Sequence, residues 1–352
     1  MTTVIPTTLE EIGADWVSAV LGADVFAVRV ADAHEGTTGR GLVRLDAVPG
    51  SGVPAELFVK LPPTVPSQRQ FVVSSGMGRR EALFYQQLGS SVPIRVPHCY
   101  FAATDDTGEH YIMLLEQLEA SGCSFRNASK HYSWQYLASM MEVFARLHAA
   151  FWNSTRFESD LAWVQAPQQH PIAAQLVQRA LAEHAGAMPP VFSALAELYL
   201  AETDAIHRLW NRGVPTLVHG DAHDGNLFMD AGRPGLLDWA LVARAPGMRD
   251  VGYFLAATLK PGDRDSQLVE LLAVYRRALV EEGVASAPAE DQLLEELRWH
   301  AVYVWLGSVV TLAMGDAWQP ANYVRAALGR LHDTLLALDC AGAIRRGIGP
   351  AA

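Results

Sequence analysis

The residue types best suited to chemistry lie between positions 217 and 239. Asp221 is followed by Asn226 at a spacing of five residues, and Asp238 comes twelve residues after Asn226. A carboxylate can accept a proton from a hydroxyl group, while an amide oxygen and a second carboxylate can hold a hard cation such as Mg²⁺. This order of groups therefore suits a reaction in which a hydroxyl group is deprotonated beside a bound magnesium ion.

The segment around these residues predicts a hairpin that would bring two of them together. Leu227–Met229 and Leu236–Leu237 are short apolar runs joined by a turn rich in Gly, Pro and Asp. If the turn centres on Gly232, Asn226 faces Asp238 across the antiparallel pair, at about 5 Å. The sequence therefore predicts that Asn226 and Asp238 share one metal ion.

The same stretch has other interpretations, which stay open at this point. Asp221 and Asp224 are also explained as turn residues, since Asp-Gly is common in turns, and Asp230 is expected to be a plain turn residue. His219, Asp221 and His223 alternate as His-x-Asp-x-His, a pattern that zinc hydrolases use. A structural histidine that hydrogen-bonds the backbone is the alternative for His219.

A lysine and a glutamate upstream could position phosphate groups. Lys60 lies in a strand-like run that ends at two prolines, and Glu81 lies on the apolar stripe of a helical pattern at 77–88. A carboxylate in an apolar face is unfavourable unless it is paired, and Lys60 is the obvious partner. A strand lysine paired with a helix glutamate orients phosphates in kinases. Otherwise, Lys60 is an edge-strand gatekeeper and Glu81 is solvated.

A glycine-rich segment at 35–41 is a candidate phosphate loop. Gly36 and Gly39 would let backbone N–H groups approach a phosphate, although a hairpin turn explains them equally well. The sequence contains neither a Walker-type Gly-x-x-x-x-Gly-Lys motif nor a Gly-x-Gly-x-x-Gly motif after a strand. A P-loop nucleotidase and a nicotinamide dehydrogenase are therefore disfavoured.

Composition narrows the class of protein. The 352 residues carry a net charge of −11, which argues against a nucleic-acid partner because phosphate binding needs a basic surface. Three widely spaced cysteines fit free thiols in a reducing compartment, and no signal peptide is evident, so we expect a cytoplasmic protein. The longest apolar run, near 302–314, is too short to span a bilayer and predicts a buried helix.

The order of predicted elements indicates an α+β protein with two lobes. Residues 1–117 form a small β-rich lobe with one helix inserted between its strands, and residues 118–352 form a larger, mainly helical lobe. In the second lobe only 216–239 interrupts the helical pattern. The candidate residues thus come from both predicted lobes.

Several segments together resemble the aminoglycoside phosphotransferase and choline-kinase-like family, which includes ecdysteroid-kinase-like relatives. By this resemblance Asp250 would brace the catalytic loop, although a helix N-cap explains it as well. The resemblance extends over about 30–335. The matching segments are Arg80–Tyr85, Tyr111–Leu118, Leu147–Trp152, His219–Asn226, Leu236–Trp239 and Arg249–Phe254.

The resemblance implies a protein-kinase-like fold, with ATP and Mg²⁺ as cofactors. Asp221 would be the catalytic base, and Asn226 and Asp238 would bind the metal ion, as in the kinase layout. The backbones of Glu116 and Leu118 would hydrogen-bond adenine. The chain is therefore expected to phosphorylate a hydroxyl group of a small molecule.

The identity of that molecule is open at the level of sequence. Antibiotic, sugar, amino alcohol and other alcohol acceptors all fit, but the C-terminal stretch 341–348 has no run of acidic residues for a polycationic aminoglycoside. A nucleotide-binding regulatory protein without catalysis is the alternative from another class. The intact set of candidate residues speaks against it: Lys60, Glu81, Asp221, Asn226 and Asp238.

Overall fold

The computed structural model describes residues 4–34, 38–125, 132–316 and 318–349, which divide into two compact units. The first unit contains Met1–Phe125 and also Phe228–Val242, and the second contains Arg126–Leu227 and Ala243–Ala352. The chain therefore returns to the first unit for one short segment. The predicted division into functional lobes at residue 117 stays a prediction.

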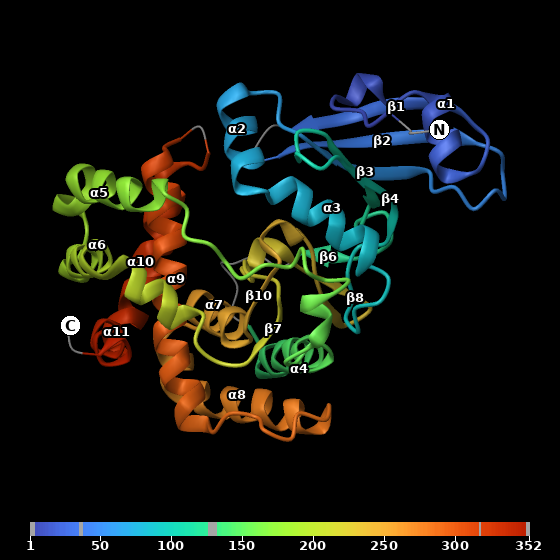
Figure 1. Ribbon diagram of the computed structural model, residues 1–352. Coiled ribbons are helices and arrows are strands. Elements are labelled where there is room, and N and C mark those ends of the chain that lie inside the picture. Colours follow the sequence, from blue (N-terminus) through green and yellow to red (C-terminus); the bar gives the residue numbers. More distant parts are fainter. Residues whose placement is uncertain (1–3, 35–37, 126–131, 317, 350–352) are drawn as a thin grey trace. The chain divides into compact units, whose positions relative to one another are not determined.

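A five-stranded antiparallel sheet forms the centre of the first unit, in the order β1-β2-β3-β5-β4 (Figure 1). Its strands are rich in β-branched and aromatic residues, which favour pleated surfaces. Val43, Leu57, Val59 and Ile112 are among the side chains that form its apolar core. The strands are β1 (Val25–His34), β2 (Gly39–Ala47), β3 (Glu56–Leu61), β4 (Cys99–Thr104) and β5 (Tyr111–Glu116).

Helices flank this sheet: the sequence predicts two of them, at 8–22 and 77–88, and the structure has one more. The predicted helix at 77–88 is α3 (Met77–Gln87), which packs on β4 and β5, and α1 (Ala14–Leu21) packs on β1. The additional helix α2 (Pro66–Ser75) is rich in Val and Ser but begins at Pro66, where a missing N–H does no harm. It ends at Gly76, whose φ of 68° turns the chain into α3.

The predicted hairpin is present with a tighter turn. It joins β8 (Leu227–Asp230) to β9 (Arg233–Leu236) through Ala231 and Gly232, whose φ angles are 47° and 83°. Its centre therefore lies between these two residues and not on Gly232. The prediction that the hairpin register places Asn226 opposite Asp238 is therefore wrong, because both residues lie outside the paired strands. A short strand β6 (Ser124–Phe125) pairs with β8.

The second unit is mainly helical, as predicted. A two-stranded ladder of β7 (Pro215–Val218) and β10 (Ala243–Pro246) is its sheet within the described residues. A final helix follows α10 where the sequence predicted none. The helices are α4 (Trp134–Ala150), α5 (Ile172–His184), α6 (Pro190–Trp210), α7 (Met248–Thr258), α8 (Pro261–Glu281), α9 (Glu290–Met314), α10 (Ala321–Ala337) and α11 (Cys340–Ile348).

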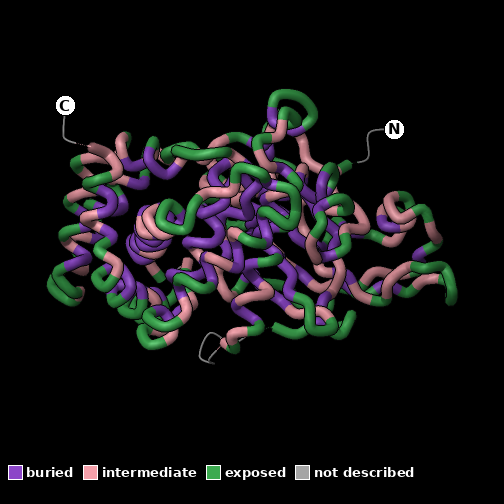
Figure 2. The backbone as a smooth tube through the Cα atoms, turned by 90° about the horizontal axis from the view of Figure 1, so that it is seen from below, coloured by how far each residue is buried: buried purple, intermediate pink, exposed green. Residues whose placement is uncertain are grey.

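Helix α9 is the centre of this unit. It contacts α5, α7, α10 and α11. Its buried residues lie on all sides, as expected of a helix enclosed by others. In Figure 2 buried residues lie mostly toward the inside of the chain path, and exposed residues lie on the loops and on the outer turns of the helices. The predicted buried helix near 302–314 is therefore confirmed as part of α9.

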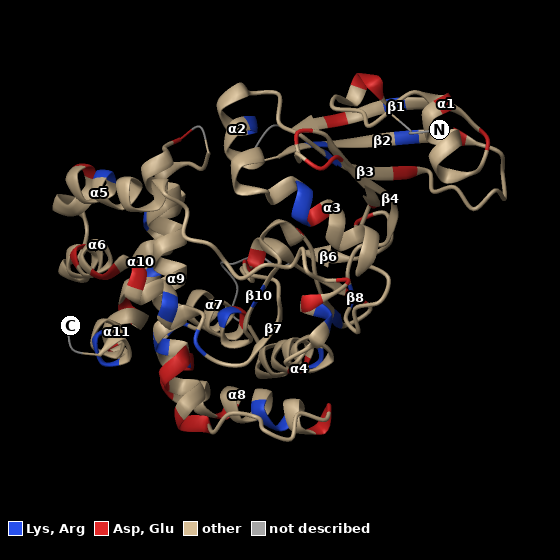
Figure 3. Ribbon diagram, in the orientation of Figure 1, with Lys and Arg blue, Asp and Glu red and all other residues tan. Residues whose placement is uncertain are grey.

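Charged side chains are dispersed along the elements of both units. Figure 3 shows Lys and Arg scattered among Asp and Glu, without one element that gathers the basic residues. Among the helices that the structure describes, none combines the length and hydrophobicity needed to span a bilayer.

Candidate active site

Lys60, Glu81 and Asp238 form a buried ion cluster in the first unit. The ammonium group of Lys60 on β3 lies 2.5 Å from Glu81 Oε2 on α3 and 3.0 Å from Asp238 Oδ1. The side chains of Lys60 and Glu81 are only 4% and 0% exposed, whereas that of Asp238 is 24% exposed. The predicted pairing of Lys60 with Glu81 is therefore present, and the second carboxylate joins the same ammonium group.

The charges of this cluster do not balance. Burial alone would lower the pKa of Lys60, but Asp238 and Glu81 raise it on balance, so the ammonium form persists. Burial raises the pKa of Glu81; Lys60 counteracts this and Asp238 reinforces it. One cation thus faces two carboxylates, and the cluster has an excess negative charge when all three groups are ionised. That charge favours an added cation or a proton.

The backbone conformation at Asp238 determines the direction of its carboxylate. Asp238 has φ 64° and ψ 71°, a left-handed conformation that is uncommon outside glycine. Trp239, the next residue, donates its N–H to Glu81 Oε1 at 3.2 Å and stacks on Phe84 with ring centroids 3.9 Å apart. These contacts hold the strained residue in place, as is common at functional sites.

The predicted adenine contacts lie at the end of β5. Cys123 N–H donates to the carbonyl group of Leu118 at 2.9 Å, and within the described chain no acceptor contacts the N–H of Leu118. The Glu116 side chain accepts hydrogen bonds from Arg95 Nη2 at 2.7 Å and from His98 N–H at 2.9 Å. A backbone donor thus remains available beside a strand end that side chains hold in place.

Arg95 is a residue of the first unit that sequence reasoning missed. Its guanidinium group bonds Glu116 and also donates to Asp230 Oδ2 at 2.7 Å, and it lies over the ring of Phe228 at 5.2 Å. Asp230 is therefore an ion-pair partner as well as the last residue before a turn. Burial would raise the pKa of Glu116, but the hydrogen bonds that Glu116 accepts from Arg95 and from the His98 N–H lower it overall. A single arginine between apolar residues gave no sequence signal for this role.

The glycine-rich segment is only partly described. Gly36 lies outside the described residues. Gly39 is the first residue of β2, and a Cβ atom there would lie 2.8 Å from the carbonyl oxygen of Pro62. Close packing against the neighbouring strand therefore explains this glycine, and its predicted contact with phosphate stays a prediction.

Asp221 and Asn226 come together in the second unit. Asn226 Nδ2 donates to the backbone oxygen of Asp221 at 2.9 Å and to its Oδ2 at 3.1 Å. This leaves the amide oxygen of Asn226 as the atom that could contact a metal ion. Asp238 belongs to the other unit, so a metal ion shared with Asn226 stays a prediction.

Asp250 organises the loop that carries Asp221. It is fully buried and accepts hydrogen bonds from the N–H groups of His219 at 2.7 Å and Gly220 at 2.8 Å. His148 Nε2 lies 3.3 Å from the same carboxylate. Asp250 lies inside the first turn of α7, whose N-cap is Gly247, so the N-cap interpretation is wrong and the bracing contacts are present.

The histidines of this loop do not form the zinc site that the His-x-Asp-x-His pattern could indicate. His219 is fully buried, and its Nδ1 accepts the N–H of Asp221 at 3.2 Å. His223 Nδ1 accepts the N–H of Gly225 at 3.0 Å. Within the residues described, no group of three or more His, Cys, Asp or Glu side chains could hold a metal ion. His219 therefore has the structural role given as its alternative.

Two tyrosines reach the same loop and were not singled out for it by the sequence. The Tyr303 hydroxyl on α9 donates to the carbonyl oxygen of Gly220 at 3.2 Å, and Tyr253 on α7 lies beside Tyr303, with ring centroids 6.1 Å apart. Only the approach of α7 and α9 to the loop reveals these contacts.

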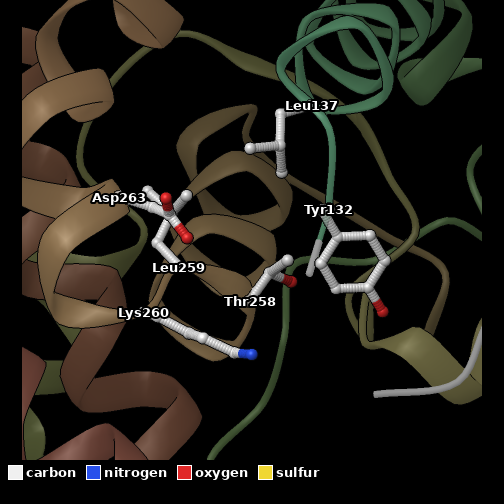
Figure 4. A pocket seen from close by; sticks show the side chains of 6 residues that line it. All are labelled: Tyr132, Leu137, Thr258, Leu259, Lys260 and Asp263. Carbon is white, nitrogen blue, oxygen red and sulfur yellow. The ribbon is translucent and has the colours of Figure 1, made fainter. Parts of the chain in front are cut away.

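A small pocket in the second unit is lined by residues outside the predicted set. Figure 4 shows it between the start of α4 and the junction of α7 with α8. None of its lining residues belongs to the candidate catalytic set. They are Tyr132, Leu137, Thr258, Leu259, Lys260 and Asp263.

A comparison with protein families gives one match. The model of the phosphotransferase enzyme family matches residues 50–285, about two-thirds of the chain. This span includes Lys60, Glu81, Asp221, Asn226 and Asp238. No curated protein sequence matches the chain significantly.

Solved structures match nearly the whole chain at low sequence identity. A choline kinase from Cryptosporidium parvum aligns with a TM-score of 0.54 and 11% identity over 96% of this chain and 94% of that one. A macrolide 2′-phosphotransferase from Brachybacterium faecium gives 0.50 and 16% over 99% of each chain. The GDP complex of aminoglycoside 2′-phosphotransferase-IIIa gives 0.51 and 11% over 93% and 99%. These likenesses confirm the predicted kinase-like α+β fold.

Proposed function

Because the chain belongs to the phosphotransferase enzyme family, it is a small-molecule phosphotransferase, and we propose that it transfers the γ-phosphoryl group of ATP to an alcohol. The acceptor oxygen forms a bond to the γ-phosphorus, and the bond from that phosphorus to the β,γ-bridging oxygen breaks. ADP leaves with the electron pair, and the hydroxyl proton passes to Asp221. Asp221 lies on a loop fixed by Asp250, as a positioned base requires.

The observation that carries this proposal is the buried cluster of Lys60, Glu81 and Asp238. Lys60 has one ammonium group within hydrogen-bond distance of both carboxylates, in the arrangement that orients nucleotide phosphates in kinases. Phosphoryl transfer depends mainly on positioning and on neutralising charge. A lysine held rigidly by a buried glutamate meets the first requirement.

The residues present also fit a divalent cation. Asp238 supplies carboxylate oxygens and Asn226 an amide oxygen, the ligand types that Mg²⁺ prefers. When bound, Mg²⁺ would neutralise phosphate charge that Lys60 alone cannot. The excess negative charge of the Lys60 cluster favours such an ion.

The nucleotide is proposed to bind at the end of β5. The backbone N–H of Leu118 and the carbonyl group of Glu116 would bond the adenine edge, while Gly36 and Gly39 remain candidates for phosphate contacts. One solved relative of this fold is a complex with GDP, so guanine nucleotides belong in the test. The acceptor is proposed to be other than a polycationic aminoglycoside, since the C-terminal stretch 341–348 has no run of acidic residues.

The first test compares wild-type protein with Asp221→Ala and Asp221→Asn. Both variants should lose phosphoryl transfer by at least about 10³-fold, because neither can accept the proton. Both should bind Mg·ATP with nearly unchanged affinity. Nucleotide consumption is measured over a panel of alcohols, sugars and antibiotics with ATP and GTP, and nucleotide binding by calorimetry.

The panel also separates the alternatives. Turnover by Asp221→Ala at the wild-type rate would remove Asp221 as the base. Wild-type protein that binds Mg·ATP but turns over with no acceptor would instead be a nucleotide-binding regulatory protein. Turnover with one class of acceptor would identify the substrate class.

A further inference from the structure

Arg40 lies directly beside Lys60 in the sheet of the first unit. The register of β2 and β3 pairs Arg40 with Lys60. Directly opposed residues of an antiparallel pair point to the same face, with their Cβ atoms about 5 Å apart. Two cations therefore stand side by side on one face of the sheet. Like charges in this position destabilise a sheet, so their presence calls for a physical reason.

The alternation of burial along β2 identifies this face. From Gly39 to Asp46 the odd-numbered residues are buried and the even-numbered ones are at least partly exposed. Val43, one of the buried residues, packs in the apolar core of the unit. Arg40 therefore projects from the opposite face of the sheet, on which Lys60 meets Glu81 of α3.

Arg40 differs from the other arginines of β1 and β2 in its partners. Arg44 Nε, on the same face of β2, donates to Glu56 Oε1 at 2.8 Å. Arg29 of β1 is paired with Asp46. Among the residues that the structure describes, no carboxylate pairs with Arg40, and its Nε is buried without a hydrogen-bond partner. Buried donors are nearly always paired, so this one indicates a partner from outside the chain.

The neighbours of Arg40 do not supply that partner. His34 of β1 faces Arg40 in the register, but His34 Nε2 bonds Asp32 Oδ2 at 2.8 Å. Thr38, two residues before Arg40, is 3% exposed, and its hydroxyl group also lacks a partner within the described chain. The glycine-rich segment at 35–41 thus contains two side-chain donors that the described residues leave unpaired.

The charge of Arg40 also acts on Lys60. Burial and, as a smaller effect, Arg40 lower the pKa of Lys60, whereas Asp238 and Glu81 raise it, and the net shift is upward. The two cations are therefore close enough to repel each other. An anion bound between them would be attracted by both, and this attraction would offset the repulsion.

The position of Arg40 agrees with the direction in which the nucleotide is proposed to lie. Leu57 of β3 pairs with Glu116, beside the proposed adenine contacts, and Lys60 follows three residues later. A strand rises about 3.3 Å per residue, so Lys60 and Arg40 stand about 10 Å along the sheet from the base site. A nucleotide with its base at the end of β5 would thus extend its phosphates toward both cations.

We propose that Arg40 is a second phosphate-binding residue, whose guanidinium group holds two oxygens of the nucleotide phosphates next to Lys60. This inference rests on the proposed function, in which the first unit binds a nucleoside triphosphate. A guanidinium group can contact two phosphate oxygens at once, whereas an ammonium group acts as a point charge. Arg40 therefore favours nucleotides with a phosphate chain over free nucleosides.

The test is Arg40→Met, which keeps an unbranched apolar stem and removes the charge. Calorimetry measures the binding of Mg·ATP, Mg·ADP and adenosine to wild type and variant. We expect the affinity for both nucleotides to fall by about 10- to 100-fold, as for the loss of a hydrogen bond to a charged group, and that for adenosine to stay unchanged. Arg40→Lys should recover part of the loss, because it restores the charge without the bidentate contact.

A matched control lies on the same strand and the same face. Arg44→Met removes the same charge from a side chain that pairs with Glu56, and it should leave the affinity for Mg·ATP unchanged. Thermal unfolding of the ligand-free proteins adds a readout that separates binding from folding. Arg40→Met should unfold at the wild-type temperature or above it, since it removes a cation opposite Lys60.

The outcomes separate this inference from the proposed function. If wild type binds Mg·ATP and Arg40→Met binds it equally well, the inference is overturned and the proposed function stands. An equal loss of affinity in Arg44→Met would indicate a general effect of charge, and a lower unfolding temperature of ligand-free Arg40→Met would indicate a structural role; either would also overturn the inference alone. A wild-type protein that binds no nucleotide would overturn both.

Discussion

At the scale of single residues, the most telling feature is an ammonium group shared by two carboxylates. Lys60 contacts Glu81 and Asp238, and two of the three side chains are almost completely buried. Breaking a buried ion pair by removing one partner is strongly destabilising, because the remaining charge has no counterion. Here that effect would act on two carboxylates at once.

Lys60→Met therefore tests stability and function together. It should lower the free energy of unfolding by about 3 kcal/mol and the rate of phosphoryl transfer by at least about 10²-fold. Denaturant unfolding and nucleotide turnover measure these effects. Glu81→Gln is the matched control: it keeps Lys60 paired with Asp238 and should destabilise less. An equal loss of stability in both variants would contradict the charge argument.

At the scale of elements, the β8–β9 hairpin carries the chain from Asn226 to Asp238. Its two-residue turn has positive φ at both Ala231 and Gly232, the geometry of a type I′ turn. A left-handed conformation is unfavourable for an L-residue by about 1–2 kcal/mol, and asparagine adopts it more readily than alanine. Gly232 therefore fits the left-handed conformation of this turn, whereas Ala231 does not.

Ala231→Asn should stabilise the protein by about 0.5–1 kcal/mol, since Asn-Gly is a preferred pair for this turn. Gly232→Ala, the reverse change at the next position, should destabilise it by a similar amount. Thermal unfolding of both variants checks the pair. Destabilisation by Ala231→Asn would show that the Ala231 side chain makes a contact more important than its conformation.

Sequence patterns predicted elements better than they predicted contacts. Lys60 and Glu81 could be paired because a carboxylate in an apolar helical stripe needs a partner, and one lysine stood in a nearby strand. The hairpin was found from its apolar runs, but its centre was misplaced because alanine at a positive φ gives no turn signal. Arg95 and the contact of Tyr303 with Gly220 were missed, since the partners are distant in sequence and only folding brings them together.

At the scale of the whole molecule, buried histidines link stability to pH. His300 and His332 lie in the helical unit and are each 1% exposed. Burial lowers the pKa of both groups, and the charge of Arg249 lowers that of His300 further. The folded protein therefore binds these protons less readily than the unfolded chain, whose histidines titrate near pH 6.5. Above about pH 6.5 both histidines are neutral in the folded and the unfolded protein, so they do not reduce stability. As the pH falls below this value the unfolded chain takes up protons first, and the free energy of unfolding decreases.

His332→Leu isolates this effect. Neither ring nitrogen of His332 has a hydrogen-bond partner in the part of the chain that the structure describes, so the substitution leaves no group unpaired. The variant should gain stability relative to wild type as the pH falls from 7.5 to 5, measured as the difference in Tm. The difference in Tm between variant and wild type is used because other groups also respond to pH. Burial raises the pKa of Glu296, so its protonation increases the stability of both proteins as the pH falls. A pH-independent difference would contradict the prediction.

The return of Phe228–Val242 to the first unit has a consequence for biosynthesis. When residues 1–125 have emerged from the ribosome, β8 and β9 have not yet been translated. Trp239, whose indole ring stacks on Phe84, is also still missing. The N-terminal unit can be completed only after more than a hundred further residues have been translated. Until then, the ion cluster of Lys60 and Glu81 lacks Asp238. The ring of Phe84 on α3 also lacks its stacking partner, so this apolar surface is exposed to chaperones. A fragment ending at residue 125 should therefore be recovered poorly on its own, and adding 228–242 as a separate peptide should improve its recovery.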